Sequence, residues 1–229
     1  NEIAIAARAG AERTMGCFVN YGADWHGPGE ILFGNRAAVV VGEIDGTVRP
    51  RTEEMFALLK IFEPNAVLTD NIWGYLWGKL AYGAMLFATA LTPDSMAANF
   101  ADPARFEIFN RLGREVMAAA RARGITPIGF NGFDPAAFAP EASIEQSRAS
   151  IEALAVFNST SAKTHSGIWR DLAVRKRKTE VDPQIGIIVK LAREAGVDTP
   201  CLANLVNLIH DIEDGRKPQS SALIQAVLP

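Results

Sequence analysis

The chain has 229 residues, of which 48% are hydrophobic and 21% are charged, proportions typical of an ordinary globular protein. Its formal net charge of -3 offers no basic field to a nucleic acid, so we expect no nucleic-acid partner. The two cysteines and three histidines lack the spacing of metal ligands, so we expect no metal site. Two distant cysteines fit a reduced, cytoplasmic location.

The first part of the chain mixes helices and strands. Its opening residues lack the features of a signal peptide and resemble the interior of a helix ended by Gly10, so we expect the native protein to begin upstream. Residues 26–30 form a predicted turn that is followed by no helix, which excludes a nucleotide-binding motif there. Strands are predicted over residues 14–23, 31–35 and 37–46, then a helix over 52–62 and a short extended segment over 66–69.

The predicted helix over residues 52–62 is amphipathic, and its spacing places four apolar residues on one face. Such a face ordinarily packs against the sheet or helices of the same domain. The four residues are Met55, Leu58, Leu59 and Phe62.

The stretch from Asn71 to Pro93 is the most informative part of the sequence, because Lys79 is its single charged residue. A helix this apolar must be buried on most sides. Burial lowers the pKa of a lysine toward the range that suits proton exchange near neutral pH. Two other interpretations stay open: the stretch is long enough to span a bilayer, and Lys79 could merely pack its stem while its charge reaches water.

From residue 71 onward the sequence predicts almost only helices. The change of composition near residue 70 predicts two domains, a mixed α/β domain over residues 1–70 and an all-α domain over residues 71–229. Ser143 is the predicted N-cap of one of these helices. Helices are predicted over residues 102–124, 143–161, 182–196 and 199–215, and an ordered loop over residues 125–140.

A second polar segment spans residues 163–186. Asp182 precedes a proline and is a candidate N-cap of the helix that follows. Glu180 is not needed for capping, so it is freer to act in a functional site. The four consecutive cations at residues 175–178 could form a solvated surface or contact phosphates.

Several short motifs stand in a definite order along the chain. They are, in the strand region, Pro28-Gly29-Glu30-Ile31 and Val41-Gly42-Glu43, and further on Trp77-Gly78-Lys79-Leu80, Ser166 to Asp171, Lys178-Thr179-Glu180-Val181-Asp182 and Gly196 to Pro200. Each motif alone is weak, whereas together they cover essentially the whole chain. Their order and spacing resemble those of ketopantoate reductases (2-dehydropantoate 2-reductases).

This resemblance implies an N-terminal Rossmann domain for NADPH, followed by a helical domain of the 6-phosphogluconate dehydrogenase C-terminal type. No G-x-G-x-x-G in this sequence follows a strand and opens a helix. Residues 1–70 would therefore be an α/β remnant that holds the last strands of a Rossmann-type sheet, and residues 71–229 the complete helical domain. The missing part, roughly a hundred residues, is domain-sized. The resemblance also implies NADP as cofactor, a 2-keto acid as substrate, no membrane partner and a homodimer.

The resemblance also assigns roles to two residues. A lysine at the position of Lys79 acts as the general acid toward the developing alkoxide, which needs a proton and a positive charge beside it. A glutamate at the position of Glu180 helps to bind the ligand and cofactor and positions the lysine. The hydride itself comes from the nicotinamide.

Three further positions are candidates for substrate binding, and they depart from the family pattern. The family usually has asparagines four and eight residues after the lysine, where this chain has Gly83 and Phe87, and Ser166 keeps only part of a pair of serines. We therefore expect a 2-keto acid with a bulkier or aromatic side chain, unless Asn158 or Ser166 replaces the missing amides. An alternative from another class is a non-catalytic helical module, for binding or dimerisation, that kept the fold.

Overall fold

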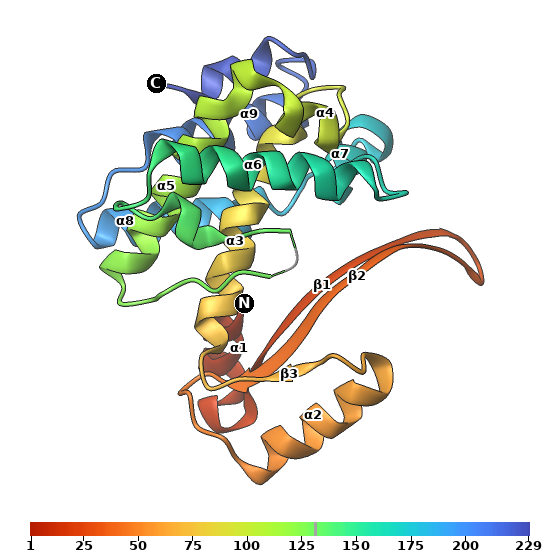
Figure 1. Ribbon diagram of the computed structural model, residues 1–229, viewed down its shortest axis with the longest axis vertical. Helices are drawn as coiled ribbons and strands as arrows, with labels where there is room; N and C mark the ends of the chain where they lie inside the picture. Colours follow the sequence, from red (N-terminus) through yellow and green to blue (C-terminus); the bar gives the residue numbers. More distant parts are fainter. Residues whose placement is uncertain (131) are drawn as a thin grey trace.

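The structure is a computed structural model that describes residues 1–130 and 132–229. Its N-terminal part is a small α/β unit, and the remainder is helical (Figure 1). The fold class expected from the sequence is confirmed. The N-terminal elements are α1 (Glu2–Ala9), the 3-10 turn η1 (Ala11–Arg13), β1 (Met15–Gly27), β2 (Glu30–Glu43), α2 (Pro50–Phe62) and β3 (Val67–Leu68).

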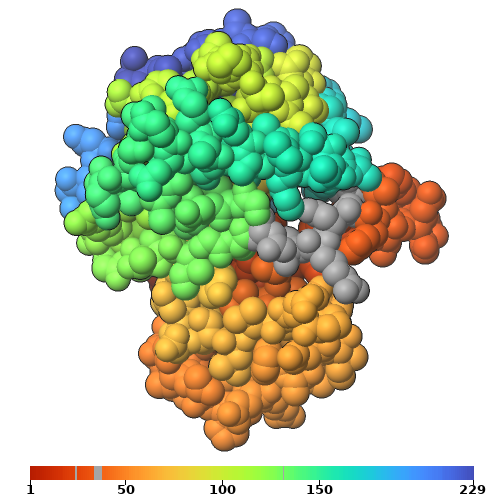
Figure 2. Space-filling model, viewed as in Figure 1, coloured from red at the N-terminus to blue at the C-terminus, as the bar shows by residue number. Residues whose placement is uncertain are grey.

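The three strands form one sheet in the order β1-β2-β3. β1 and β2 are antiparallel neighbours and make a long hairpin, so the two strand-like runs predicted after residue 30 are one continuous strand. β2 and β3 are parallel, and α2 connects them. A parallel pair joined through a helix is the connection that builds α/β sheets. The space-filling view shows the sheet side below the helical part, with the hairpin projecting to one side (Figure 2).

The helical part begins with α3 (Ile72–Thr89), which runs from the sheet into the middle of the other helices (Figure 1). Asn71 caps its start, with the side-chain oxygen accepting a hydrogen bond from the Gly74 amide at 3.0 Å. The elements that follow are α4 (Met96–Ala101), η2 (Pro103–Arg105), α5 (Phe106–Ala122), η3 (Pro135–Phe138), α6 (Ile144–Ser159), α7 (Gly167–Arg170), the π-helical turns η4 (Asp171–Arg175) and η5 (Asp182–Gly186), α8 (Ile187–Glu194), α9 (Pro200–Glu213) and η6 (Leu223–Val227).

α3 is the central helix of the core, as its apolar sequence predicts. Met85, Phe87 and Leu91 have no exposed surface, and they pack with buried residues of α5 and α9 in one cluster. In the part of the chain that the structure describes, no helix is long and apolar enough to cross a membrane, α3 included. The bilayer interpretation of residues 71–93 is therefore wrong.

The start of α3 lies directly against the sheet because two strand residues are glycines. A Cβ atom at Gly16 would come within 2.6 Å of the Ile72 side chain, and one at Gly42 would overlap the carbonyl oxygen of Thr69. Phe18 and Ile72 form a small buried cluster at this junction. Strand and helix can approach this closely only where a side chain is missing.

α2 lies at the predicted position, but its apolar face is largely uncovered. Of the four residues of that face, Met55 is 37% exposed, Leu58 55% and Phe62 56%. The sheet described here has only three strands, which is narrower than the surface a helix of this length can cover. The helix formed where the pattern predicted it, but among the described residues its apolar face is not packed as an amphipathic face ordinarily is.

Two predicted helix starts have the expected chemistry. The Ser143 hydroxyl accepts from the Gln146 amide at 3.3 Å, and the Gln146 side chain accepts from the Ser143 amide at 2.7 Å, which is a capping box. The Asp102 carboxylate accepts from the Ala104 amide at 2.9 Å and opens the turn before α5. The short helix α4 was not predicted.

Candidate active site

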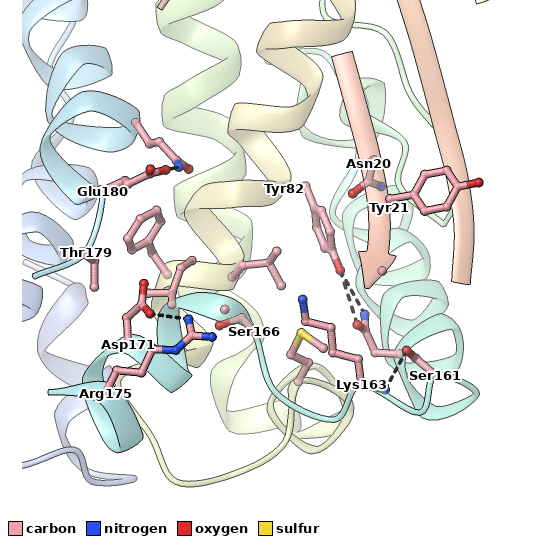
Figure 3. Close-up of a pocket in the computed structure, with 18 of the residues that line it drawn as sticks. Asn20, Tyr21, Tyr82, Ser161, Lys163, Ser166, Asp171, Arg175, Thr179 and Glu180 are labelled. Atoms are coloured by element: carbon pink, nitrogen blue, oxygen red, sulfur yellow. Dashed lines mark hydrogen bonds and ion pairs between the residues drawn. The ribbon is translucent and has the colours of Figure 1, made fainter. Parts of the chain in front are cut away.

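A cavity of about 650 Å³ lies between α3, the hairpin and the segment from α6 to η5. Figure 3 shows Glu180 and Thr179 on one side of it and Tyr82, Asn20 and Lys163 on the other. Its apolar wall includes Leu86 of α3 together with residues of α4 and α7. The residues that line it include Asn20, Tyr21, Tyr82, Leu86, Phe87, Met96, Asn158, Ser161, Lys163, Ser166, Ile168, Asp171, Arg175, Arg177, Lys178, Thr179, Glu180 and Gln184.

Lys79 lies one turn before Gly83 on α3, where the helix leaves the sheet. Its ammonium donates a hydrogen bond to the Val19 carbonyl of β1 at 2.7 Å and lies 5.6 Å from the centre of the Phe18 ring. Lys79 is exposed, yet partial burial of its ammonium lowers the pKa of Lys79 below its usual range. The charges of Cys17, Glu180 and Glu2, in that order, act in the opposite direction on the pKa of Lys79. The lysine is therefore held in place and releases its proton more readily than an ordinary surface lysine.

Glu180 lies just before η5 and faces the cavity with its side chain exposed. Its carboxylate accepts a hydrogen bond from the Gln184 side chain at 2.7 Å. On α3, a Cβ atom at Gly83 would come 4.0 Å from the Gln184 side-chain oxygen. Gln184 thus lies between Glu180 and the helix that carries Lys79. The sequence analysis missed Gln184, which its spacing of four residues from Glu180 at a helix start could have indicated.

On the face of α3 that carries Lys79, the large apolar side chain is Leu86, and not Phe87 as the sequence had suggested. Phe87 borders the cavity but has no exposed surface, because its ring belongs to the core. Leu86 is half-buried and lines the same wall. An α-helix has 3.6 residues per turn. Leu86, seven residues after Lys79, is therefore nearly two full turns along and lies on the same face, whereas Phe87, eight residues after Lys79, is rotated about 80° away. The face that starts at Lys79 therefore continues through Gly83 to Leu86.

Ser166 is buried and lines the cavity, but its oxygen already has a structural role. It is the N-cap of α7 and accepts a hydrogen bond from the Trp169 amide at 3.1 Å. The hydroxyl proton is not used by this cap, so Ser166 can still donate a hydrogen bond toward the cavity.

A cluster of charges forms the rim near η4. Arg175 and Arg177 both donate to Asp171, at 2.8 and 2.9 Å, and these two hydrogen bonds lower the pKa of the Asp171 carboxyl despite its partial burial. Lys178 lies 3.7 Å from Asp214. The run of cations at residues 175–178 therefore lies on the surface, as one interpretation predicted, and three of its members also border the cavity.

Asp182 does not have the capping role that its sequence position suggested. The residue that precedes η5 is Val181, which makes no side-chain cap. The Asp182 carboxylate instead lies 3.1 Å from His210 of α9. The N-cap interpretation of Asp182 is wrong because the first turn here is a π-helical turn, which shifts where its amides point.

Tyr82 and Asn158 meet at the end of the cavity away from Glu180. The Tyr82 hydroxyl lies 3.4 Å from both the oxygen and the nitrogen of the Asn158 side chain. Sequence analysis did not identify Tyr82, because an aromatic residue in an apolar helix is ordinarily part of the core. Among the described residues, no group of three or more His, Cys, Asp or Glu could hold a metal ion.

Comparison with known proteins places this architecture in a family. Residues 71–213 match the family model described as ketopantoate reductase PanE/ApbA C terminal. This match covers more than half of the chain, and the chain belongs to the ketopantoate reductase family. The 2-dehydropantoate 2-reductase of Archaeoglobus fulgidus is 26% identical over 207 residues, which are 89% of this chain and 62% of that protein.

Solved structures share the fold. A 2-dehydropantoate 2-reductase from Geobacter metallireducens GS-15 superposes with a TM-score of 0.73 at 19% identity, covering 92% of this chain and 64% of that one. A D-mandelate dehydrogenase solved with NADH gives a TM-score of 0.71 at 19% identity, covering 88% of this chain and 62% of that one. These relatives are oxidoreductases, and the chain spans a little over three fifths of their length.

Proposed function

We propose that this chain is the substrate side of an NADPH-dependent reductase that converts a 2-keto acid to a 2-hydroxy acid. The observation that carries the proposal is Lys79, whose ammonium has a lowered pKa and is fixed by the Val19 carbonyl. Lys79 itself is not among the residues that line the cavity, but Tyr82 and Leu86 of the same helix are, and so is Glu180. Membership of the ketopantoate reductase family supports an oxidoreductase of this kind.

In the proposed reaction, Lys79 acts on the oxygen of the substrate carbonyl. NADPH, when bound, supplies the hydride that reduces the carbonyl carbon. As charge develops on the oxygen, the Lys79 ammonium stabilises it and then donates a proton from Nζ, which leaves the neutral amine and a hydroxyl group. The lowered pKa of Lys79 suits this transfer.

Glu180 and Ser166 are proposed to prepare this step. The Glu180 carboxylate favours the charged form of Lys79, so the lysine still carries its proton when the substrate binds. A 2.7 Å hydrogen bond from the Gln184 side chain keeps the Glu180 carboxylate in position. Ser166 is placed to donate its hydroxyl proton to an oxygen of the substrate.

The described residues fit only part of a dinucleotide. Gly27 ends β1 and Gly29 lies in the hairpin turn. Among residues 1–130 and 132–229, no glycine-rich turn leads from a strand into a helix, the arrangement that holds a pyrophosphate. We propose that residues 1–70 are the end of a nucleotide-binding domain and that Glu180 is this chain's contact with the cofactor. The β2–α2–β3 connection supports that assignment. We also propose a homodimer.

The proposal is tested by NADPH oxidation with a panel of 2-keto acids, using the full-length polypeptide that contains this chain. Lys79→Ala should lower kcat by about 10²–10⁴, the usual range for general acid catalysis. Glu180→Gln should raise KM and lower kcat without unfolding the domain. Lys60→Ala, which removes an exposed lysine of α2, is the matched control and should leave turnover unchanged. A Lys79→Ala enzyme that keeps more than a third of the wild-type rate would refute the role of Lys79.

A further inference from the structure

A second cavity, of about 620 Å³, is lined by residues of α7, η4, the end of α9 and the segment that follows α9. Asp171 and Arg175 of η4 border the candidate active site (Figure 3), whereas Leu172 and Lys176 border the second cavity. Arg177 borders both cavities. We call the second one the α9 cavity, and the proposed reaction makes no use of it.

Positive charge predominates around the α9 cavity. The charged residues that line it, among those the structure describes, are Lys176, Arg177, Lys217 and Glu213. With the groups that ion pairs link to them, six cations lie beside four carboxylates. Both counts leave a surplus of two positive charges, although the whole chain has a formal net charge of -3. The cations are residues 175–178 with Arg216 and Lys217, and the carboxylates are Asp171, Asp211, Glu213 and Asp214.

Lys176 is the lining cation that is available to a ligand. Arg177 lies 2.9 Å from Asp171 and Lys217 lies 2.8 Å from Asp211, so both of these cations are already paired. Lys176 is exposed, and it makes no ion pair with any residue that the structure describes. A phosphate monoester carries about 1.5 to 2 negative charges at neutral pH, which matches the surplus around the cavity.

The backbone of Lys176 has a conformation that ordinarily calls for glycine. Lys176 directly follows η4 with φ 50° and ψ 49°, in the left-handed region. The helices α5, α8 and α9 are each followed by a glycine in this region, namely Gly124, Gly196 and Gly215, with φ of 70°, 72° and 71°. A side chain is disfavoured there because its Cβ atom comes close to the following carbonyl oxygen. A lysine kept at such a position fits a role for its ammonium at the cavity.

The apolar lining of the cavity includes an aromatic ring that is held in place. The Trp169 indole N–H donates a hydrogen bond to the Thr92 carbonyl at 3.0 Å, and the His165 ring lies against the indole with ring centres 4.1 Å apart. Leu172 and Ile212 add aliphatic surface. The cavity has the volume of an ordinary small-molecule site, so it can take a flat apolar group beside its cations.

We propose that the α9 cavity binds a phosphate monoester that has a flat apolar body, such as an aryl phosphate. The phosphate group lies against Lys176 and Lys217, and the apolar body packs on Trp169 and Leu172. The inference is independent of the proposed function, because neither Lys176 nor Trp169 lines the candidate active site. A ligand held elsewhere on the molecule therefore does not depend on Lys176.

The test follows the indole N–H signals of the isotope-labelled full-length polypeptide by NMR during a titration with phenyl phosphate. Trp169→Phe identifies the signal of Trp169, which should shift saturably. Inorganic phosphate, which lacks an apolar body, and benzoate, which carries a single charge, should each bind more weakly. Lys176→Gly should bind phenyl phosphate about 1.4- to 5-fold more weakly, the range for one exposed ion pair. The same variant should unfold at or above the wild-type temperature, because glycine adopts the left-handed conformation without strain.

Two variants serve as controls. Lys176→Arg keeps the charge and should keep the affinity, and Lys190→Ala, which removes an exposed lysine of α8, should leave the affinity unchanged. The inference is overturned if the Trp169 signal does not shift saturably, or if Lys176→Gly binds phenyl phosphate as tightly as the wild type does. Equal affinity for inorganic phosphate would reject the apolar body of the ligand, and equal affinity for benzoate would reject the phosphate group.

Discussion

Gly78 and Gly83 lie five residues apart on α3, and their replacement by alanine should have opposite effects. A Cβ atom at Gly78 would overlap the carbonyl oxygen of Ile128. That loop is held against the helix by a hydrogen bond from the Ile128 amide to the Gly74 carbonyl at 2.9 Å. At Gly83 the nearest atom to a Cβ is the Gln184 side-chain oxygen at 4.0 Å, so the space is free.

The expected difference in stability follows from two terms. In a helix interior, alanine is more favourable than glycine by about 0.5–1 kcal/mol, and this gain applies at both positions. At Gly78 the backbone of Ile128 must also move, and overpacking of this kind costs about 1–3 kcal/mol. The two variants should therefore differ by about 1–3 kcal/mol, or about 2–12 °C in Tm for a chain of this size.

The assay is thermal unfolding of the wild type and both variants, followed by circular dichroism under identical conditions. Gly83→Ala should unfold at or above the wild-type temperature, and Gly78→Ala should unfold below Gly83→Ala by the margin given. Equal Tm values for the two variants would show that the Ile128 loop does not lie on α3 at Gly78. A strongly destabilised Gly83→Ala would show that the Lys79 face of α3 is not open toward Gln184.

Two further predictions concern the sheet side of the molecule. Calorimetry of the chain with NADPH should show weak binding or none, because the described residues form no pyrophosphate cradle; low-micromolar binding would contradict this. The side-chain hydrogen bond from Arg51 lowers the pKa of the buried Glu43. The stability that this pair contributes is therefore present above the ordinary carboxyl pKa of 4.5 and is lost as the pH falls through the lower folded-state pKa. Urea unfolding should show a weaker acid dependence in Glu43→Gln, and identical pH profiles would reject the assignment.

The elements whose formation depends on local sequence were the predictable part. Helix α6 was expected from Ser143 and α9 from the Thr199-Pro200 start, and each lies within a few residues of its predicted span. The division between a mixed N-terminal part and a helical remainder followed from composition. Lys79 could be singled out because a charge within a long apolar helix is unusual whatever the tertiary structure.

Features that depend on contacts between distant segments were not predictable. Tyr82 and Asn158 are 76 residues apart, and nothing in either local sequence indicates that they meet. The sequence analysis placed both Gly83 and Phe87 on the face of Lys79. With 3.6 residues per turn, however, the Phe87 side chain points toward the core. The π-helical turns η4 and η5 likewise shift side chains by one position relative to an α-helix, which a pattern based on regular periodicity does not register.

The tight junction between α3 and the sheet has a consequence for mutational scanning. Gly16 and Gly42 let the helix start touch the strands, and two turns later Lys79 is hydrogen-bonded to β1 itself. The position of the proposed proton donor therefore depends on the strands more than on the surrounding helices. A scan scored by enzyme turnover alone would classify Gly16 and Gly42 with the catalytic positions, although neither lines the cavity. Measuring both protein abundance and enzyme turnover for each variant would separate catalytic side chains from residues whose backbone contacts position them.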